Sequence, residues 1–188
     1  PLPQFFPLAI KITQQLGDIH NENLIHKDIN PGNIVWNQES DAVKIIDFGL
    51  ATSLSRENPQ IRNPNVLEGT LAYISPEQSG RMNRAVDYRS DFYSLGVTFY
   101  ELLTGMLPFN TKDPMELVHA HIAKQPISPT EHNKNIPIVI SKIITRLLNK
   151  NAEERYQSAF GLRRDLEQCW EQWQDTQIIA PFPLGEHD

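Results

Sequence analysis

Apolar residues recur at steps of three and four near the start of the chain. They are Phe5, Leu8, Ile12, Leu16 and Ile19. This spacing places side chains along one face of a helix and predicts an amphipathic helix over residues 5–19.

Two short apolar runs follow the loop signal Pro31-Gly32. They are NIVW (33–36) and VKIID (43–47), and the polar stretch NQESDA separates them. Short runs rich in Ile and Val on either side of a polar turn are typical of paired strands. We therefore expect a small β-hairpin.

The rest of the chain is predicted to be mostly helical. Residues 51–80 are polar and irregular, but residues 87–105 are apolar almost all round a helical wheel, which is typical of a helix buried on every side.

Three further helices are predicted downstream. Asp113 and Pro114 carry the signature of a helix start, with Glu116 three residues after the cap. Two amphipathic helices follow, with the apolar faces Ile140, Ile143, Ile144, Leu147, Leu148 and Leu162, Leu166, Cys169, Trp170, Trp173.

The pattern indicates a mainly α fold with a small β-hairpin, in the α+β class. We assign residues 1–174 to one domain and residues 175–188, which contain two prolines, to a linker or tail toward a further domain. The chain has 188 residues, of which 39% are hydrophobic, a composition that suits a globular protein.

Charge and cysteine content narrow the partners and the compartment. The net charge of −6 is spread without a basic cluster, which argues against a nucleic acid or an anionic membrane as partner. The single cysteine, Cys169, excludes an internal disulfide and suits a reducing compartment. No apolar run approaches the ~20 residues that span a bilayer, so we expect a cytoplasmic protein.

Three polar residues, Asp28, Asn33 and Asp47, stand among the apolar runs of the predicted hairpin. Phosphoryl transfer requires metal ions held against phosphates and a carboxylate that orients the nucleophile. Carboxylate and amide oxygens are hard ligands that suit Mg²⁺. These residues could converge on one metal cluster, although their spacing alone leaves this open.

The same residues resemble protein kinase motifs. HKDINPGN (26–33) is similar to the catalytic loop, and Asp47-Phe48-Gly49 is similar to the metal-binding DFG motif. The resemblance implies that Asp28 is the catalytic base and that Asn33 and Asp47 bind the Mg²⁺ of ATP. It also implies that His26 packs at the start of the loop.

Small-molecule kinases of the aminoglycoside and choline type carry a similar loop and an IIDF sequence. GTLAYISPEQ (69–78), however, resembles the end of a protein kinase activation segment. Residues 90–109 resemble the central helix of the larger kinase lobe. The resemblance therefore favours a serine/threonine protein kinase with a protein hydroxyl as substrate.

Other positions take roles by the same resemblance. Thr70 matches the threonine that hydrogen-bonds the catalytic aspartate. Glu77 should form a buried ion pair with Arg155, and Asp91 should accept hydrogen bonds from the backbone of the catalytic loop. Glu77, Arg155 and Asp91 would support the site without taking part in the chemistry. Phe48 and Gly49 would have the same supporting role.

Lys27 and Asn30 depart from the family pattern. Lys27 replaces the arginine that grips a phosphorylated activation segment, and residues 56–69 contain no Ser, Thr or Tyr. We expect activation without phosphorylation there, with Lys27 paired to an acid such as Glu68. Asn30 replaces a lysine that meets the transferring phosphate, so the rate of transfer is in question.

The resemblance covers residues 5–174 and only the larger, C-terminal lobe of a kinase. The sequence has no glycine-rich phosphate loop, no strand lysine and no partner glutamate for that lysine. We interpret the chain as part of a longer kinase, inactive without its N-terminal lobe. A pseudokinase-like binding module is the alternative.

The stretch FPLGEHD resembles the connector after the kinase domain of large bacterial signalling proteins.

Overall fold

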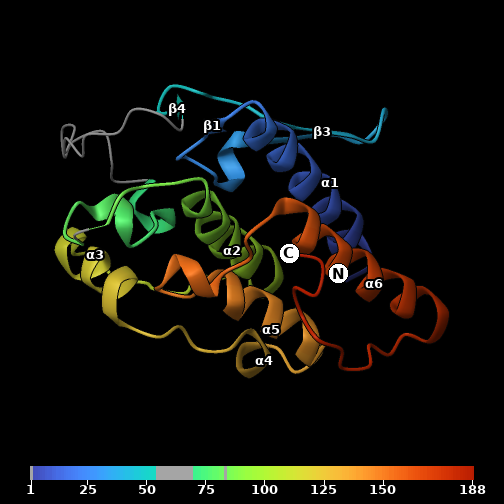
Figure 1. Cartoon of the computed structure of the whole chain (residues 1–188). Coiled ribbons are helices and arrows are strands. Elements are labelled where there is room, and N and C mark those ends of the chain that lie inside the picture. Colours follow the sequence, from blue (N-terminus) through green and yellow to red (C-terminus); the bar gives the residue numbers. More distant parts are fainter. Residues whose placement is uncertain (1, 54–69, 83) are drawn as a thin grey trace.

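The computed structural model describes residues 2–53, 70–82 and 84–188 (Figure 1). Helices dominate it, as predicted. The α-helices are α1 Leu2–Asn21, α2 Arg89–Thr104, α3 Pro114–Ala123, α4 Pro129–His132, α5 Ile138–Leu147 and α6 Ala159–Thr176. Single turns of 3-10 helix are η1 Pro31–Asn33, η3 Thr70–Tyr73, η4 Glu77–Ser79 and η5 Ala152–Glu154.

The described strands form two antiparallel pairs. β2 (Ile34–Asn37) and β3 (Ala42–Ile45) make the expected hairpin, with Ile34 opposite Ile45. The sequence did not indicate the second pair, in which β1 (Leu24–Ile25) lies beside β4 (Thr52–Ser53). Two-residue strands carry too little periodicity to be detected, so only the path of the chain brings them together.

Helix α1 buries the predicted face against α6, which runs alongside it (Figure 1). Phe5, Ile12 and Leu16 are buried. The ring of Phe6 stacks on Trp170 of α6 with centroids 5.3 Å apart. The helix thus forms one wall of the core and ends just before the polar loop.

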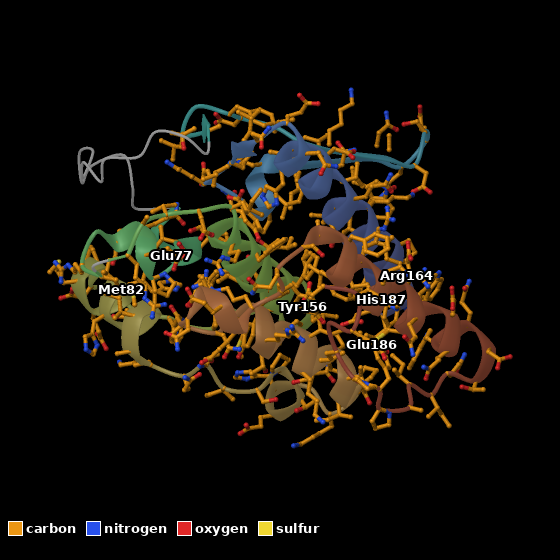
Figure 2. The ribbon with its side chains drawn as sticks, in the orientation of Figure 1. Glu77, Met82, Tyr156, Arg164, Glu186 and His187 are labelled. Atoms are coloured by element: carbon orange, nitrogen blue, oxygen red, sulfur yellow. The ribbon has the colours of Figure 1, made fainter. Side chains whose placement is uncertain are left out.

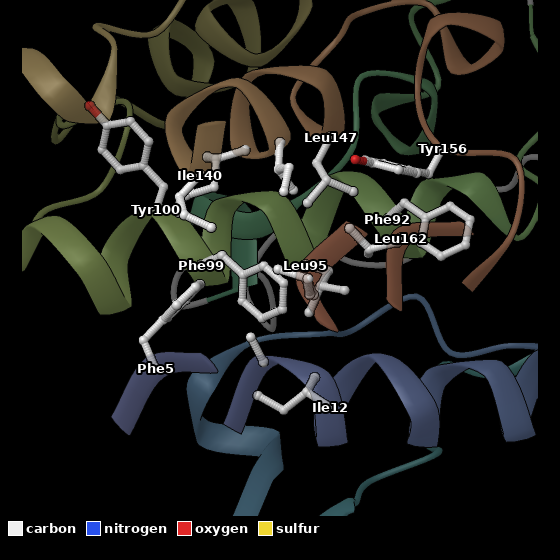
Figure 3. Close-up of a cluster of buried hydrophobic side chains, with 14 of the residues drawn as sticks. Phe5, Ile12, Phe92, Leu95, Phe99, Tyr100, Ile140, Leu147, Tyr156 and Leu162 are labelled. Carbon is white, nitrogen blue, oxygen red and sulfur yellow. The ribbon is translucent and has the colours of Figure 1, made fainter. Parts of the chain in front are cut away.

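Helix α2 crosses the centre of the core (Figure 3), and every residue from Ser90 to Tyr100 is buried. The expectation of a helix covered on all sides is confirmed for this stretch, whereas Leu102 in the last turn is 44% exposed. Gly96 allows the close approach of α5, because a Cβ at this position would lie 2.7 Å from the Cβ of Leu147. The start of α2 is therefore a rigid base for any residue attached to it.

Helix α3 begins as predicted, with one difference at its cap. Asp113 Oδ1 accepts hydrogen bonds from the amides of Met115 and Glu116, at 2.8 and 3.0 Å. The Glu116 carboxylate does not complete a reciprocal capping box. It accepts hydrogen bonds from Thr111 and Lys124 instead, and the Asp113 amide donates to the Thr111 hydroxyl.

The segment that follows α6 folds back onto the helices. The expected boundary at residue 174 lies inside α6, which continues to Thr176. In the following residues, Ile179 is buried and the Gly185 amide donates to Asp165 of α6 at 2.8 Å. Proline-rich composition predicts the absence of a helix, but it does not reveal whether a segment finds a surface to pack on.

Within the described ranges, none of the helices has the length and apolar character needed to cross a membrane.

Candidate active site

The side chain of Asp28 lies at the centre of a set of hydrogen bonds within the loop 26–33. Asn33 Nδ2 donates to Asp28 Oδ2 at 3.0 Å and to the Asp28 backbone oxygen at 2.8 Å. Asn30 Nδ2 donates to Asp28 Oδ1 at 2.9 Å. The loop therefore aligns a half-buried carboxylate with two amide groups.

Asn30 uses both ends of its side chain inside the loop. Its Nδ2 contacts Asp28, and its Oδ1 accepts from the Gly32 amide at 2.9 Å, which caps the 3-10 turn η1. In this arrangement Asn30 orients Asp28 rather than extending toward solvent.

His26 joins this loop to the residue before Asp47. Its Nδ1 accepts from the Asp28 amide at 3.2 Å, so the ring proton belongs on Nε2, which faces the Ile46 carbonyl at 3.0 Å. The Ile46 amide in turn donates to the Asn33 carbonyl at 2.9 Å. The backbone of Ile46 is therefore held at both its N–H and its C=O.

Asp47 follows directly and turns the chain. Its φ is +64°, a left-handed conformation that aspartate tolerates better than most residues. Its Oδ1 accepts from the Gly49 amide at 3.1 Å, and the next ring, Phe48, packs edge-on against His26 at 4.9 Å. The structure thus brings both sequence motifs into one compact unit.

Asp91, at the buried start of α2, holds the loop from below. Its Oδ2 accepts from the His26 amide at 2.9 Å and its Oδ1 from the Lys27 amide at 2.7 Å. His20 Nε2 also contacts Asp91 Oδ2, at 2.9 Å. Sequence reasoning missed His20, because nothing in the spacing links a residue on α1 to one 71 positions later.

The backbone of Lys27 is held at both its N–H and its C=O. It has a φ of +67°, and its carbonyl accepts from Gln78 Nε2 at 2.9 Å. Gln78 belongs to η4, so it ties the loop to the stretch that also carries Glu77. It is a second residue that sequence reasoning missed.

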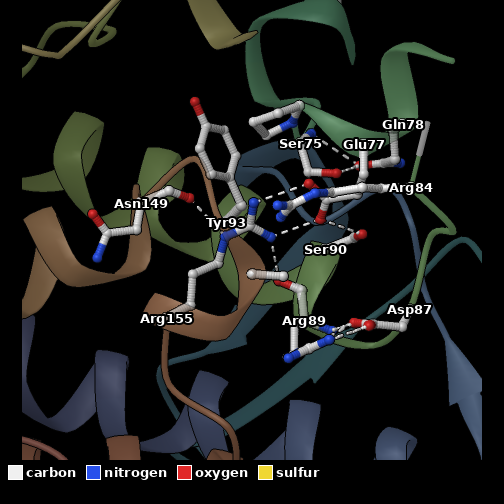
Figure 4. A network of polar contacts seen from close by, with 12 residues as sticks. Ser75, Glu77, Gln78, Arg84, Asp87, Arg89, Ser90, Tyr93, Asn149 and Arg155 are labelled. Carbon is white, nitrogen blue, oxygen red and sulfur yellow. Dashed lines mark hydrogen bonds and ion pairs between the residues drawn. The ribbon is translucent and has the colours of Figure 1, made fainter. Parts of the chain in front are cut away.

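The predicted ion pair between Glu77 and Arg155 is present and buried (Figure 4). Arg155 Nη1 and Nη2 donate to Glu77 Oε1 and Oε2 at 2.6 and 2.9 Å, and Ser90 Oγ donates to Oε1 at 2.7 Å. The other donors of Arg155 go to the carbonyls of Asn149, Arg89 and Lys150. Burial raises the pKa of Glu77, but Arg155 and Ser90 outweigh burial and hold the pKa below its ordinary value.

Two regions can now be distinguished. The first consists of residues 28–33 and 46–49, and we call it the catalytic edge because it carries the residues expected at the active site. The second, the buried support, consists of Glu77, Asp91 and Arg155. Large apolar side chains in or next to the catalytic edge face solvent (Val35, Ile46, Phe48 and Leu50, each between 42% and 47% exposed).

The donor set at the catalytic edge fits a hard cation. The Nδ2 of Asn33 is turned to Asp28, which leaves its Oδ1 for a metal, and Asp47 retains one oxygen beside the one that meets Gly49. The parts of the chain that are described contain no group of three or more His, Cys, Asp or Glu side chains suited to a metal. Any Mg²⁺ bound by these two residues would therefore complete its shell with water and phosphate oxygens.

Some expectations concern residues outside the described part of the chain. These are the side chain of Thr70 and the partner Glu68 suggested for Lys27.

The comparisons with known proteins agree with these motifs. The family model for the protein kinase domain matches residues 7–168. The chain belongs to the protein kinase family. Curated serine/threonine kinases are among its relatives.

Three relatives illustrate the extent of the match. The chain is 35% identical to the serine/threonine-protein kinase PknB of Mycobacterium leprae, over 88% of this chain and 26% of that protein. It is 36% identical to PksC of Streptomyces coelicolor, over 82% and 28%. It is 34% identical to the hybrid signal transduction histidine kinase G of Dictyostelium discoideum, over 87% and 7%. The chain thus spans little more than a quarter, at most, of the length of these three proteins.

Proposed function

We propose that this chain is the larger, C-terminal lobe of a serine/threonine kinase domain that transfers the γ-phosphate of ATP to a protein hydroxyl. The observation that carries the proposal is the arrangement at the catalytic edge. There Asp28 is aligned by the Asn30 and Asn33 amides, and Ile46 ties this loop to Asp47.

In this proposal Asp28 orients the substrate hydroxyl and accepts its proton as the oxygen attacks phosphorus. The Asn30 and Asn33 amides donate to both oxygens of Asp28, so they restrict its rotation before substrate arrives. Restricting the base in this way lowers the entropic cost of reaching the reactive geometry.

Asn33 and Asp47 would hold Mg²⁺ through their remaining oxygens. When bound, the metal neutralises charge on the phosphates of ATP. The left-handed turn at Asp47 and its bond to the Gly49 amide hold the carboxylate beside the loop. Thr70 remains a candidate partner of Asp28 from the family resemblance.

We also propose that an N-terminal lobe covers the catalytic edge in the complete protein. Large apolar side chains grouped beside charged residues are typical of an interface. Val35, Ile46, Phe48 and Leu50 would meet that lobe, which would supply the phosphate loop and lysine that this sequence lacks. The small share of each relative that the chain covers supports the same interpretation.

The decisive test uses the native full-length protein and measures transfer of labelled phosphate to a generic protein substrate. Asp28→Ala should lower kcat by about 10²- to 10⁴-fold, the usual contribution of a general base. Asp47→Asn should raise the KM for Mg-ATP, because asparagine keeps the left-handed turn and the bond to Gly49 but removes the charge.

Glu39→Gln is the matched control, since it removes an exposed carboxylate from the turn of the same hairpin. It should transfer phosphate at the wild-type rate. A wild-type kcat in Asp28→Ala, together with an unchanged KM for Mg-ATP in Asp47→Asn, would show that the site is wrongly assigned. A wild-type protein that transfers no phosphate would favour the pseudokinase interpretation.

The size of the native polypeptide tests the proposed second lobe. An intact mass well above 21.5 kDa, with sequence before Pro1, is expected. A native product of this length would contradict the proposal.

A further inference from the structure

The C-terminal segment 177–188 is fastened to the start of α6 by the side chain of Asp188. Asp188 Oδ1 accepts from the amides of Gln157 and Ser158 at 3.1 and 3.2 Å, and Oδ2 pairs with Arg146 at 2.9 Å. The side chain is only 10% exposed. A Cβ at Gly161 would lie 2.4 Å from Asp188 Oδ1, so the glycine in the first turn of α6 leaves room for this carboxylate.

The rest of the segment packs around the same point. Arg146 also donates to the Leu184 carbonyl, and a Cβ at Gly185 would lie 2.4 Å from the Arg146 guanidinium. Figure 2 places His187 in this segment, and its ring meets that of Phe160 edge-on at 6.5 Å. The segment is therefore attached through several groups to Gln157 and its neighbours.

Gln157 connects this attachment to the start of α2. Its carbonyl accepts from the Tyr88 hydroxyl at 2.9 Å, and its Oε1 accepts from Arg89 Nη1 at 3.0 Å. Gln157 thus links the two residues, because its amide donates to Asp188 and its carbonyl accepts from Tyr88.

Tyr88 in turn packs on His20, with ring centroids 5.4 Å apart and the planes at 67°. His20 contacts Asp91, whose two oxygens bind the amides of His26 and Lys27. An unbroken series of contacts therefore runs from Asp188 to the backbone beside Asp28.

A solvent-open pocket of about 500 Å³ lies beside this series, where the end of α1 meets the start of α6. His20, Tyr88, Gln157 and Phe160 are among its lining residues. The ring of His20 packs edge-on against both Tyr88 and the buried Phe92, each at 5.4 Å, so Tyr88 is one of two rings that hold His20 against Asp91.

We propose that Tyr88 and Asp188 are positioning residues of the phosphate-transfer site, acting through Gln157, His20 and Asp91. Asp188 restrains Gln157, Gln157 restrains Tyr88, and Tyr88 keeps His20 on Asp91. The segment after the kinase domain thereby influences the catalytic loop without touching it. The effect on kcat rests on the proposed function, whereas the effect on the loop backbone does not.

The test measures hydrogen exchange at the His26 and Lys27 amides in the native full-length protein, with phosphate transfer as the second readout. Asp188→Ala should speed this exchange and lower kcat about three- to tenfold, as expected when one member of a coupled network is removed. The KM for Mg-ATP should stay constant, because Asp188 contacts Arg146 and α6 rather than the catalytic edge. Glu186→Ala, in the same segment but exposed, is the matched control and should behave as wild type.

Tyr88→Phe is the second variant, because it removes only the hydroxyl that meets Gln157 and keeps the ring on His20. It should change exchange and kcat in the same direction, and the double variant should show less than the product of the two effects. A lower midpoint of thermal unfolding for Asp188→Ala, with wild-type exchange and kcat well below that midpoint, would overturn the proposal. If the wild type itself transfers no phosphate, the proposed function fails and the exchange data still decide this inference.

Discussion

The catalytic edge and the buried support use similar side chains in opposite surroundings. At the edge, Asp47 is exposed and Phe48 is 46% exposed. In the support, Arg155 and Asp91 are both fully buried. Carboxylates occur in both regions, so residue type does not separate them.

The difference lies in how completely each polar atom is bonded. Every N–H donor of Arg155 has an acceptor, and both oxygens of Asp91 accept from backbone amides. A buried charge without such partners would cost several kcal/mol, so the support has no bonding capacity to offer a ligand. The edge keeps oxygens that a ligand can use, and it relies on the support to hold them.

Breaking the support should produce the largest change in stability. Arg155→Ala leaves the Glu77 carboxylate buried without its partner, so the free energy of unfolding should fall by about 3–5 kcal/mol. Chemical denaturation measures this. The double variant Arg155→Met with Glu77→Leu should recover only part of the loss, because the carbonyls of Asn149, Arg89 and Lys150 still lose their donor. A single-variant loss below about 1 kcal/mol would show that the pair is not a support.

A second buried group should make stability depend on pH. Burial, with the nearby charge of Lys150, lowers the pKa of His121 to about 4 from 6.5. Between pH 6.5 and pH 4, His121 is therefore protonated in the unfolded chain but neutral in the folded chain. The free energy of unfolding should fall as the pH drops through this range, by up to about 3 kcal/mol. Tyr93, whose hydroxyl contacts His121 Nδ1 at 3.0 Å, faces the same ring.

His121→Gln isolates this effect, since glutamine can accept from Tyr93 but does not titrate. The difference in unfolding free energy between wild type and variant, measured from pH 7 to pH 4, should shrink or reverse as the pH falls. A difference that is constant over this range would contradict the assignment.

Asp91→Asn should have an intermediate effect. The isosteric amide keeps one oxygen, so one of the His26 and Lys27 amides loses its acceptor. Leaving a buried donor unsatisfied costs about 1–3 kcal/mol. Denaturation and hydrogen exchange at both amides should register the loss together, and unchanged exchange would argue against Asp91 as the holder of the loop.

The smallest effect should come from the apolar surface beside the edge. Val35 on β2 is 47% exposed, so Val35→Thr should change the stability of the chain by no more than about 0.5 kcal/mol. Val43→Thr, the same substitution at a 6% exposed site on β3, should cost about 1–3 kcal/mol. Equal costs at the two sites would mean that the edge is packed like the core.

Much of this arrangement could be predicted from local patterns. The face of α1, the hairpin and the buried α2 all follow from periodicity, because repeat spacing reflects which side of an element meets the core. The motif residues Asp28, Asn33 and Asp47 could be named because they are close in sequence to these elements.

Other features could not be predicted, for a physical reason. The contact of Asn30 with Asp28 depends on the turn that η1 imposes, and the half-formed cap of α3 depends on Thr111 competing for the Asp113 amide. Such choices between alternative hydrogen bonds are settled by geometry that residue type alone does not specify.

Local patterns were sufficient to predict the helical framework, the hairpin and the family, because these depend on residues near one another along the chain. The contact of His20 with Asp91 and that of Asp188 with Gln157 arise from the packing of distant elements. Contacts between residues so far apart form only when the core has brought their elements together, so no local pattern encodes them.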